Sequence, residues 1–448
     1  MAEREIAAIV LAAGEATRMK SDTPKVLHPI AGRPMIGHVL DALAALPADR
    51  VIVVVGPGMD DVVEAVAPAE TVLQEAPLGT GHAVLSAREA LAGFTGDVLV
   101  LFGADPLITP KTLRAMVAAR RTAPEPAIVA LGMRPADPAL YGRLIVSADG
   151  LLENIVEARD ATAGEQAVTL CNAGAMAVDG ALLFGLLDRV GNDNAKGEYY
   201  LTDIVAIARA DGLRCAVVEG AADELIGIDS HAGLAAAEAL VQDRLRAKAM
   251  AGGVTLLDPP TVTLSYDTAF GRDVVVEPHV VFGAGVRVGN GVRIRAFSHL
   301  EGATLADGAA VGPFARLRPG AEVGVDARVG NFVEVKNAVI EAGAKVNHLT
   351  YIGDARVGAG ANVGAGTITC NYDGFTKSHT DIGAGAFIGS NTALVAPVKV
   401  GDGAVVGAGS VITGDVAADA LALTRAPQTT RAGWAARLRA AKGKRGKG

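Results

Sequence analysis

One histidine and three cations in the carboxy-terminal half of the chain are suited to acyl transfer onto a phosphorylated amine. His348 lies in the run at residues 347–351, whereas Arg318, Lys336 and Lys377 come from separate stretches. An amine attacks a thioester only in its neutral form, so catalysis near neutral pH needs a base, and histidine titrates nearest that pH. Three cations suit a sugar phosphate dianion. We therefore expect a general base beside a phosphate site, although each residue taken singly also fits a packed histidine or an ordinary surface charge.

A loop of small residues near the amino terminus is suited to binding a polyphosphate. Residues 11–19 follow an apolar run, and Lys25 lies a few positions further on. Converging backbone N–H groups bind phosphate oxygens, and Arg18 and Lys25 supply positive charge. The run lacks the spacing of a Walker A loop. Taken alone, it also fits a tight strand-to-helix turn with solvated basic residues.

Further polar residues follow other apolar runs in the same half. Gln74 precedes a second small-residue loop, and its amide is suited to reading the edge of a base. Asp105 follows a third run and is a hard oxygen ligand suited to Mg²⁺. Gly142, Glu157 and Asn172 lie in stretches whose polar groups suit sugar hydroxyls. Together these stretches predict a nucleotide-sugar site.

The elements that position these residues alternate over the first 228 residues. Runs 6–11, 51–55 and 98–102 are typical of strands buried on both faces of a parallel sheet. Helical stretches at 34–46, 59–66 and 82–92 separate them. This alternation predicts a doubly wound, Rossmann-like α/β domain whose ligand crevice lies beyond the carboxyl ends of the strands.

A six-residue period appears after Gly253. Aliphatic residues recur at every sixth position, and glycine often follows directly, which predicts a parallel β-helix in which glycine permits the turns. The 55 glycines of the chain are thereby explained. A loop at residues 369–381 interrupts the repeat, and binding surfaces tend to lie at such interruptions. The two periodic series are Val311, Leu317, Val323, Val329 and Val335, and Ile382, Ile388, Leu394, Val400, Val406 and Ile412.

Composition bounds the class of protein. The formal charge of −8 gives no reason to expect nucleic acid as the main partner, and no apolar stretch reaches the length of a membrane helix. Three cysteines without metal-type spacing suit a reducing cytoplasm. Residues 229–250 favour one long connecting helix, and the basic run 437–447 is expected to be a solvated tail.

The sequence resembles the bacterial bifunctional N-acetylglucosamine-1-phosphate uridyltransferases/glucosamine-1-phosphate acetyltransferases over nearly its whole length. Residues 194–203 are among the more specific matching stretches. The resemblance implies a uridyltransferase domain at 1–229, a linker helix at 230–250, and a left-handed β-helix acetyltransferase domain with its tail at 251–448. It also implies a homotrimer that uses acetyl-CoA, UTP and Mg²⁺ to convert glucosamine 1-phosphate through N-acetylglucosamine 1-phosphate into UDP-N-acetylglucosamine for envelope glycans.

The resemblance further implies a role for individual residues. The uridine nucleotide is held by Leu11, Ala12, Ala13, Gly14, Lys25, Gln74, Gly79 and Thr80, and N-acetylglucosamine by Gly142, Glu157 and Asn172. Glucosamine 1-phosphate is contacted by Arg318, Lys336, Tyr351, Asn362 and Lys377, with His348 as the base. Acetyl-CoA is contacted by Ala365, Asn371, Tyr372, Ser390, Ala408 and Arg425.

The amino-terminal half departs from the family pattern at three positions. Ala16 stands where the family has glycine. Ala104 occupies the position of the family's metal aspartate, and the acid here is Asp105, which an extended backbone would point to the opposite side. Asp229 replaces an asparagine ligand, so we expect Asp229 and Asp105 to hold Mg²⁺ with weakened uridyl transfer. Two other interpretations stay open: an acetyltransferase with a regulatory nucleotide-binding domain, and a β-helix scaffold without activity.

Overall fold

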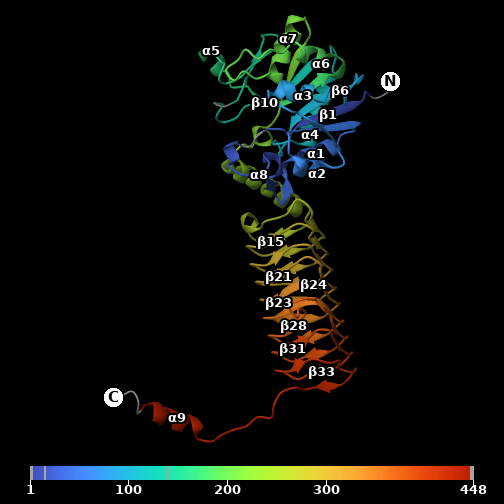
Figure 1. Cartoon of the computed structure of the whole chain (residues 1–448), viewed down its shortest axis with the longest axis vertical. Helices are drawn as coiled ribbons and strands as arrows, with labels where there is room; N and C mark the ends of the chain where they lie inside the picture. The colour runs from blue at the N-terminus through green and yellow to red at the C-terminus, as the bar shows by residue number, and fades with distance from the viewer. Residues whose placement is uncertain (1–3, 15–16, 139–140, 444–448) are drawn as a thin grey trace. The chain divides into compact units, whose positions relative to one another are not determined.

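The computed structural model describes residues 4–14, 17–138 and 141–443, and these form two compact units, Met1–Leu245 and Arg246–Gly448 (Figure 1). The boundary between the units falls inside helix α8 (His231–Ala251). This helix begins two residues later than predicted, because the Ser230 hydroxyl accepts a hydrogen bond from the N–H of Gly233 and caps it. Within the described residues, no helix is long and apolar enough to cross a membrane.

The first unit is built on a mixed sheet in the order β11-β7-β10-β6-β1-β4-β5. Strand β1 lies between β4 and β6 and is parallel to both, whereas β10 is antiparallel to β6 and β7. The chain therefore leaves β1 toward one edge and later returns to its other side, so a crevice opens beyond the carboxyl end of β1. The strands of this path are β1 (Ile6–Leu11), β4 (Arg50–Val55), β5 (Glu70–Leu73), β6 (Asp97–Phe102), β7 (Ile128–Met133), β10 (Cys171–Asp179) and β11 (Cys215–Glu219).

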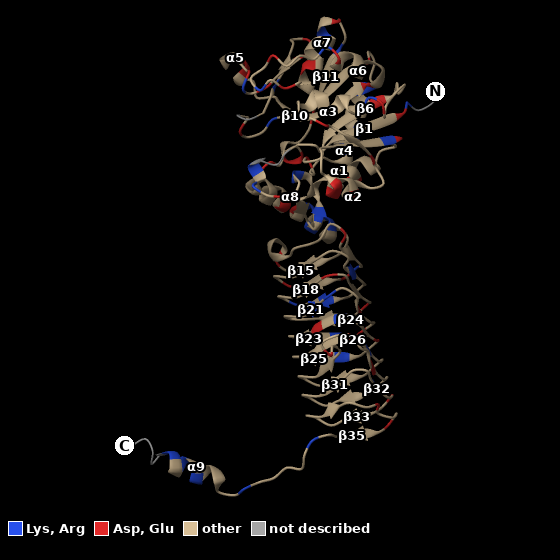
Figure 2. Cartoon of the chain, in the orientation of Figure 1, with Lys and Arg blue, Asp and Glu red and all other residues tan. Residues whose placement is uncertain are grey.

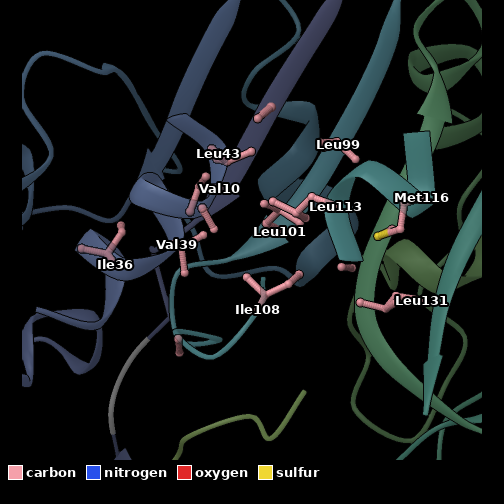
Figure 3. Close-up of a cluster of buried hydrophobic side chains, with 14 of the residues drawn as sticks. Val10, Ile36, Val39, Leu43, Leu99, Leu101, Ile108, Leu113, Met116 and Leu131 are labelled. Atoms are coloured by element: carbon pink, nitrogen blue, oxygen red, sulfur yellow. The ribbon is translucent and has the colours of Figure 1, made fainter. Parts of the chain in front are cut away.

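Helices cover both faces of this sheet. Alternate residues of β1 enter different cores: Ala8 and Val10 pack on one face, and Ile9 on the other. Figure 3 shows the first core, in which Val10 and Leu101 from the strands meet helical side chains. That core is contributed by α1 (Met35–Ala44), α2 (Asp60–Val66) and α4 (Pro110–Arg120), and the other by α3 (Thr80–Leu85), α6 (Gly180–Leu187) and α7 (Ile204–Ala210).

Helix α3 is shorter than the sequence predicts. It ends at Leu85, and residues 86–92 continue as turns. The Ser86 hydroxyl donates to the carbonyl oxygen of His82 at 3.2 Å, and such back-bonding competes with regular helix. The predicted helix over 82–92 is therefore wrong beyond Leu85.

The second unit is a parallel β-helix of short stacked strands, as the six-residue period predicts. Successive coils place Val311, Val329 and Val346 in register within one sheet, and Leu317 and Val335 in another. Every residue of the two predicted periodic series is buried. The coils carry mixed charges (Figure 2), and the basic helix α9 (Trp434–Gly443) follows them. The central strands are β21 (Arg316–Leu317), β23 (Arg328–Asn331), β24 (Glu334–Ile340), β25 (Lys345–His348) and β26 (Tyr351–Val357).

The glycines that follow aliphatic residues were expected to permit the turns, but in the structure they make room for the next coil. Gly324 and Gly364 do not adopt positive φ, but a Cβ on either would lie 2.9 and 2.6 Å from backbone atoms of the next coil. A side chain is excluded there by the close approach of neighbouring coils. The turns themselves use other glycines, such as Gly343 at φ +66°.

Candidate functional sites

The predicted nucleotide residues of the first unit line one cavity of about 290 Å³ at the end of β1. Gly79 has φ +118°, and a Cβ there would lie 2.6 Å from the carbonyl oxygen of Tyr199, so only glycine fits this position. The Thr80 hydroxyl accepts a hydrogen bond from the N–H of Leu201 at 3.0 Å and ties the second loop to that segment. The predicted residues in the lining are Leu11, Ala12, Ala13, Gly14, Lys25, Gln74, Gly79 and Thr80.

A second hollow of about 710 Å³ shares Lys25 with the first cavity and includes Arg18, Glu157 and Asp229. The predicted sugar residues lie together at its edge: a Cβ on Gly142 would be 3.6 Å from the Cβ of Asn172 and 3.7 Å from Glu157 Oε1. Burial raises the pKa of the Glu157 carboxyl, opposed by the charge of Lys196. The arrangement provides adjacent hydrogen-bonding groups from three strand ends.

Asp105 lies close to the other charged residues despite its shift in sequence. The premise of an extended segment is wrong, because the chain turns at Gly103 and Ala104 and the N–H of Asp105 bonds back to the carbonyl of Phe102. Burial raises the pKa of Asp105 to about 7, opposed by the charge of Lys25. Burial likewise lowers the pKa of Lys25, opposed by Asp105 and Asp229.

These charges fit a magnesium site that is completed by substrate. Asp229 forms an ion pair with Arg18, and Asp105 interacts with Lys25, so both carboxylates lie beside cations that are predicted to bind phosphate. Within the described part of the chain, no group of three or more His, Cys, Asp or Glu forms a ready-made cage. Mg²⁺ is commonly bound by one or two carboxylates plus substrate phosphates, which matches this pair. Ala16, the remaining departure from the family pattern, lies outside the described residues.

The cations of the second unit meet on neighbouring coils. The N–H of Arg318 bonds to the carbonyl of Val335, next to Lys336, and Arg318 forms an ion pair with Glu334 at 2.9 Å. A side-chain interaction with Lys377 and the charge of that lysine lower the pKa of Lys336, with a smaller contribution from Arg318. Two neighbouring lysines and a nearby arginine concentrate positive charge, which suits a polyanion.

An acid and a tyrosine that complete this site come from the same coils. Asp354 accepts hydrogen bonds from the amides of Asn337 and Asn371. Burial would raise its pKa, but these amides and then Lys336 and Lys377 hold it below its usual value. The ring of Tyr351 covers Gly353, which pairs in register with Lys336. Tyr351 is therefore close to Lys336, whereas sequence reasoning missed Asp354.

His348 is exposed at the end of β25, at a corner of the coil. Its Nδ1 lies 2.8 Å from Oδ1 of Asn331, with which it pairs in register. No hydrogen bond or ion pair joins His348 to Arg318, Lys336 or Lys377 within the described chain. Asn331 was missed by sequence reasoning, although its spacing of one coil before His348 is a usable signal.

The predicted acetyl-CoA residues form a column across successive coils. The carbonyl of Ala365 accepts from the N–H of Asn391, and the carbonyl of Ser390 accepts from the N–H of Gly409. Arg425 donates to the carbonyl of Ala408 at 2.9 Å. Asn371 and Tyr372 lie at the base of the predicted loop. Asn362 is one coil after Lys345, with which it pairs in register.

Comparison with known proteins matches each half of the chain. Residues 8–169 match the MobA-like NTP transferase domain, and residues 379–414 match the six-repeat bacterial transferase hexapeptide. A protein of Paramagnetospirillum magneticum named "Bifunctional protein GlmU" is 62% identical over 98% of each chain. Its namesake in Rhodospirillum rubrum is 65% identical over 97% of each chain.

Proposed function

The chain belongs to the family of bifunctional GlmU proteins, and from that membership we propose which residues of its two sites bind substrate and in what order they act. It is an enzyme with acetyltransferase and uridyltransferase activities, so the scaffold interpretation is wrong. The second unit acetylates glucosamine 1-phosphate from acetyl-CoA. The product, N-acetylglucosamine 1-phosphate, reacts with UTP in the first unit to give UDP-N-acetylglucosamine and pyrophosphate.

In acetyl transfer, Nε2 of His348 accepts a proton from the ammonium group of the substrate. The freed amine attacks the thioester carbonyl, and coenzyme A leaves as its thiol. Arg318, Lys336 and Lys377 bind the phosphate and thereby place the amine. The observation that carries this assignment is the gathering of three cations: the backbone bond from Arg318 to Val335 places Arg318 beside Lys336, and Lys377 is near enough for its charge to lower the pKa of Lys336. A bound phosphate would offset the repulsion between these charges.

In uridyl transfer, the sugar phosphate oxygen attacks the α-phosphorus of UTP and pyrophosphate leaves. Such a transfer needs positioning and charge neutralisation rather than a protein nucleophile. Lys25 and Arg18 approach the phosphates, and the loop at residues 11–14 contacts the nucleotide. Asp105 and Asp229 would hold Mg²⁺, which supplies further neutralisation of phosphate charge.

The assembly we propose is a homotrimer in the cytoplasm, with acetyl-CoA bound between neighbouring subunits. A ladder of stacked, exposed rings runs along one corner of the β-helix, with ring centroids of Phe297, Phe314 and Phe332 about 5 Å apart. A contiguous exposed apolar stripe supports burial against another copy. The three cysteines are free thiols, which suits a reducing compartment.

The experiment is to measure both half-reactions separately on the purified protein. His348→Ala is expected to lose acetyl-dependent thiol release by about 10² to 10⁴-fold and to keep uridyl transfer. Full acetyl turnover in His348→Ala shows that His348 is not the base. The alternative of an acetyltransferase with a regulatory nucleotide domain predicts no pyrophosphate release from UTP with N-acetylglucosamine 1-phosphate, so release of pyrophosphate excludes it.

A further inference from the structure

We propose that His82 is a positioning residue that fixes the Gln74 amide and thereby makes the first-unit site select uracil over cytosine. The inference rests on the proposed uridyl transfer, since it concerns how that site chooses its nucleotide. His82 lies in α3, on the turn that follows the second small-residue loop. No interaction with substrate is required of it.

The orientation of the amide follows from its partners. One terminal atom of Gln74 lies 3.2 Å from the carbonyl oxygen of Gly79 and 3.2 Å from Nδ1 of His82. A carbonyl oxygen can only accept, so the amide atom facing it must be the nitrogen, Nε2. The same nitrogen has a second proton, which it donates to Nδ1 of His82. In this arrangement Nδ1 of His82 is the acceptor and Nε2 is the ring nitrogen that has the proton.

The amide oxygen is consequently the atom left for a ligand. Gln74 is only 5% exposed and lines the 290 Å³ cavity. Within the described residues, no donor bonds to Gln74 Oε1, whereas both protons of Nε2 are engaged. The site therefore presents a fixed acceptor to the base, and rotation of the amide would break both hydrogen bonds at Nε2.

A fixed acceptor distinguishes the two pyrimidines. Uracil has an N–H donor at N3, which satisfies Oε1, whereas cytosine has a lone pair at N3 and would place two acceptors against each other. A site built to bond one donor rejects an analogue that lacks it, because its buried polar group is left unpaired. If the amide rotates freely, Nε2 can serve cytosine, and the discrimination falls.

Two substitutions at one position test this. In His82→Asn, the side-chain oxygen stands near the place of Nδ1 and still accepts from Gln74, whereas in His82→Leu no acceptor remains. We expect the ratio of kcat/KM for UTP to that for CTP to fall about tenfold in His82→Leu, the loss of about one good hydrogen bond. In His82→Asn the ratio should stay within about twofold of the parent value.

The acetyltransferase activity of each variant serves as the folding control, because it belongs to the other unit. Binding of UTP and CTP, measured by calorimetry on the same proteins, gives the ratio even where turnover is slow. An unchanged ratio in His82→Leu overturns the proposal, and so does an equal fall in both variants. If the parent protein binds neither nucleotide, the proposed uridyltransferase function fails together with this inference. If the parent protein binds UTP but the UTP-to-CTP ratio does not change when His82 is replaced, only the inference fails.

Discussion

Nδ1 of His348 lies 2.8 Å from the amide oxygen of Asn331, one coil earlier in the same sheet. An amide oxygen can only accept, so Nδ1 carries the proton and Nε2 presents the lone pair. The structure thus prepares the tautomer that a general base at Nε2 requires. Asn331 therefore fixes the tautomer of the proposed base.

Replacing Asn331 should therefore change the pH dependence of acetyl transfer. Asn331→Leu removes the acceptor, and we expect kcat to fall about tenfold with little change in KM for glucosamine 1-phosphate. Asn331→Asp keeps an acceptor and adds negative charge, which favours protonated His348, so the acidic limb of the pH–rate profile should move to higher pH. Superimposable profiles for the parent and Asn331→Asp would contradict this linkage.

The shifted aspartate gives a second prediction. Because Asp105 and Asp229 both interact with the Lys25 charge, we expect Asp105→Asn to lower uridyl transfer at least tenfold and to raise the Mg²⁺ concentration for half-maximal rate. The measurement is pyrophosphate release over a Mg²⁺ titration, with acetyl transfer as the control. The double variant Ala104→Asp, Asp105→Val restores the family arrangement and should be faster than the parent. Equal rates would show that the parent arrangement is not weakened.

Because Lys336 and Lys377 are close together, we expect binding of glucosamine 1-phosphate to be coupled to the uptake of protons. Lys377 lowers the pKa of Lys336, so at alkaline pH part of Lys336 is neutral before binding. A bound phosphate dianion raises that pKa again, so binding takes up protons. Calorimetry of glucosamine 1-phosphate binding in buffers of different ionisation enthalpy measures this uptake. It should diminish in Lys377→Met, where the pKa of Lys336 is no longer depressed, and uptake unchanged in that variant would exclude the coupling.

How far the sequence predicts this structure depends on how local each signal is. The six-residue period identifies every buried rung from Val311 to Val335, because each aliphatic residue enters the interior of its own coil. The period does not show that Gly324 is needed for the approach of the next coil, since that constraint comes from residues one turn away.

In the two sites, too, the sequence predicts local features but not those that depend on other parts of the chain. The small-residue loops predict the lining of the first cavity, because loops after parallel strands meet at one edge. Asp105 was expected to point away, because the alternation rule assumes an extended chain and here the chain turns. Asp354 bonds to Asn371, one coil away, and His82 bonds to Gln74 across the intervening small-residue loop, and no local motif marks either pair.

A buried charge cluster at the amino end of β6 should stabilise the first unit without serving either site. Asp97 is fully buried and lies 2.7 Å from Nε of Arg121 and 3.4 Å from Nε of Arg120, whose side chain is 1% exposed. Arg120 keeps a second carboxylate partner, Asp179, at 2.6 Å, whereas Arg121 loses its ion pair with Asp97. Asp97→Asn should therefore lower the free energy of unfolding by about 1 to 3 kcal/mol. The exposed pair Arg50–Glu70 provides the control, and Glu70→Gln should change the same quantity by less than about 1 kcal/mol.

Separate measurements on the two units can show whether Asp97→Asn destabilises the first unit alone. Most helices belong to the first unit, so urea unfolding followed by the helical circular dichroism signal reports that unit, while acetyl transfer reports the second. We expect Asp97→Asn to lower the urea concentration at which the helical signal is lost. The urea concentration at which acetyl-transfer activity is lost should not change. A shift of both transitions together would mean that the units unfold as one, and no shift in either would mean that the arginines find other partners when the carboxylate charge is removed.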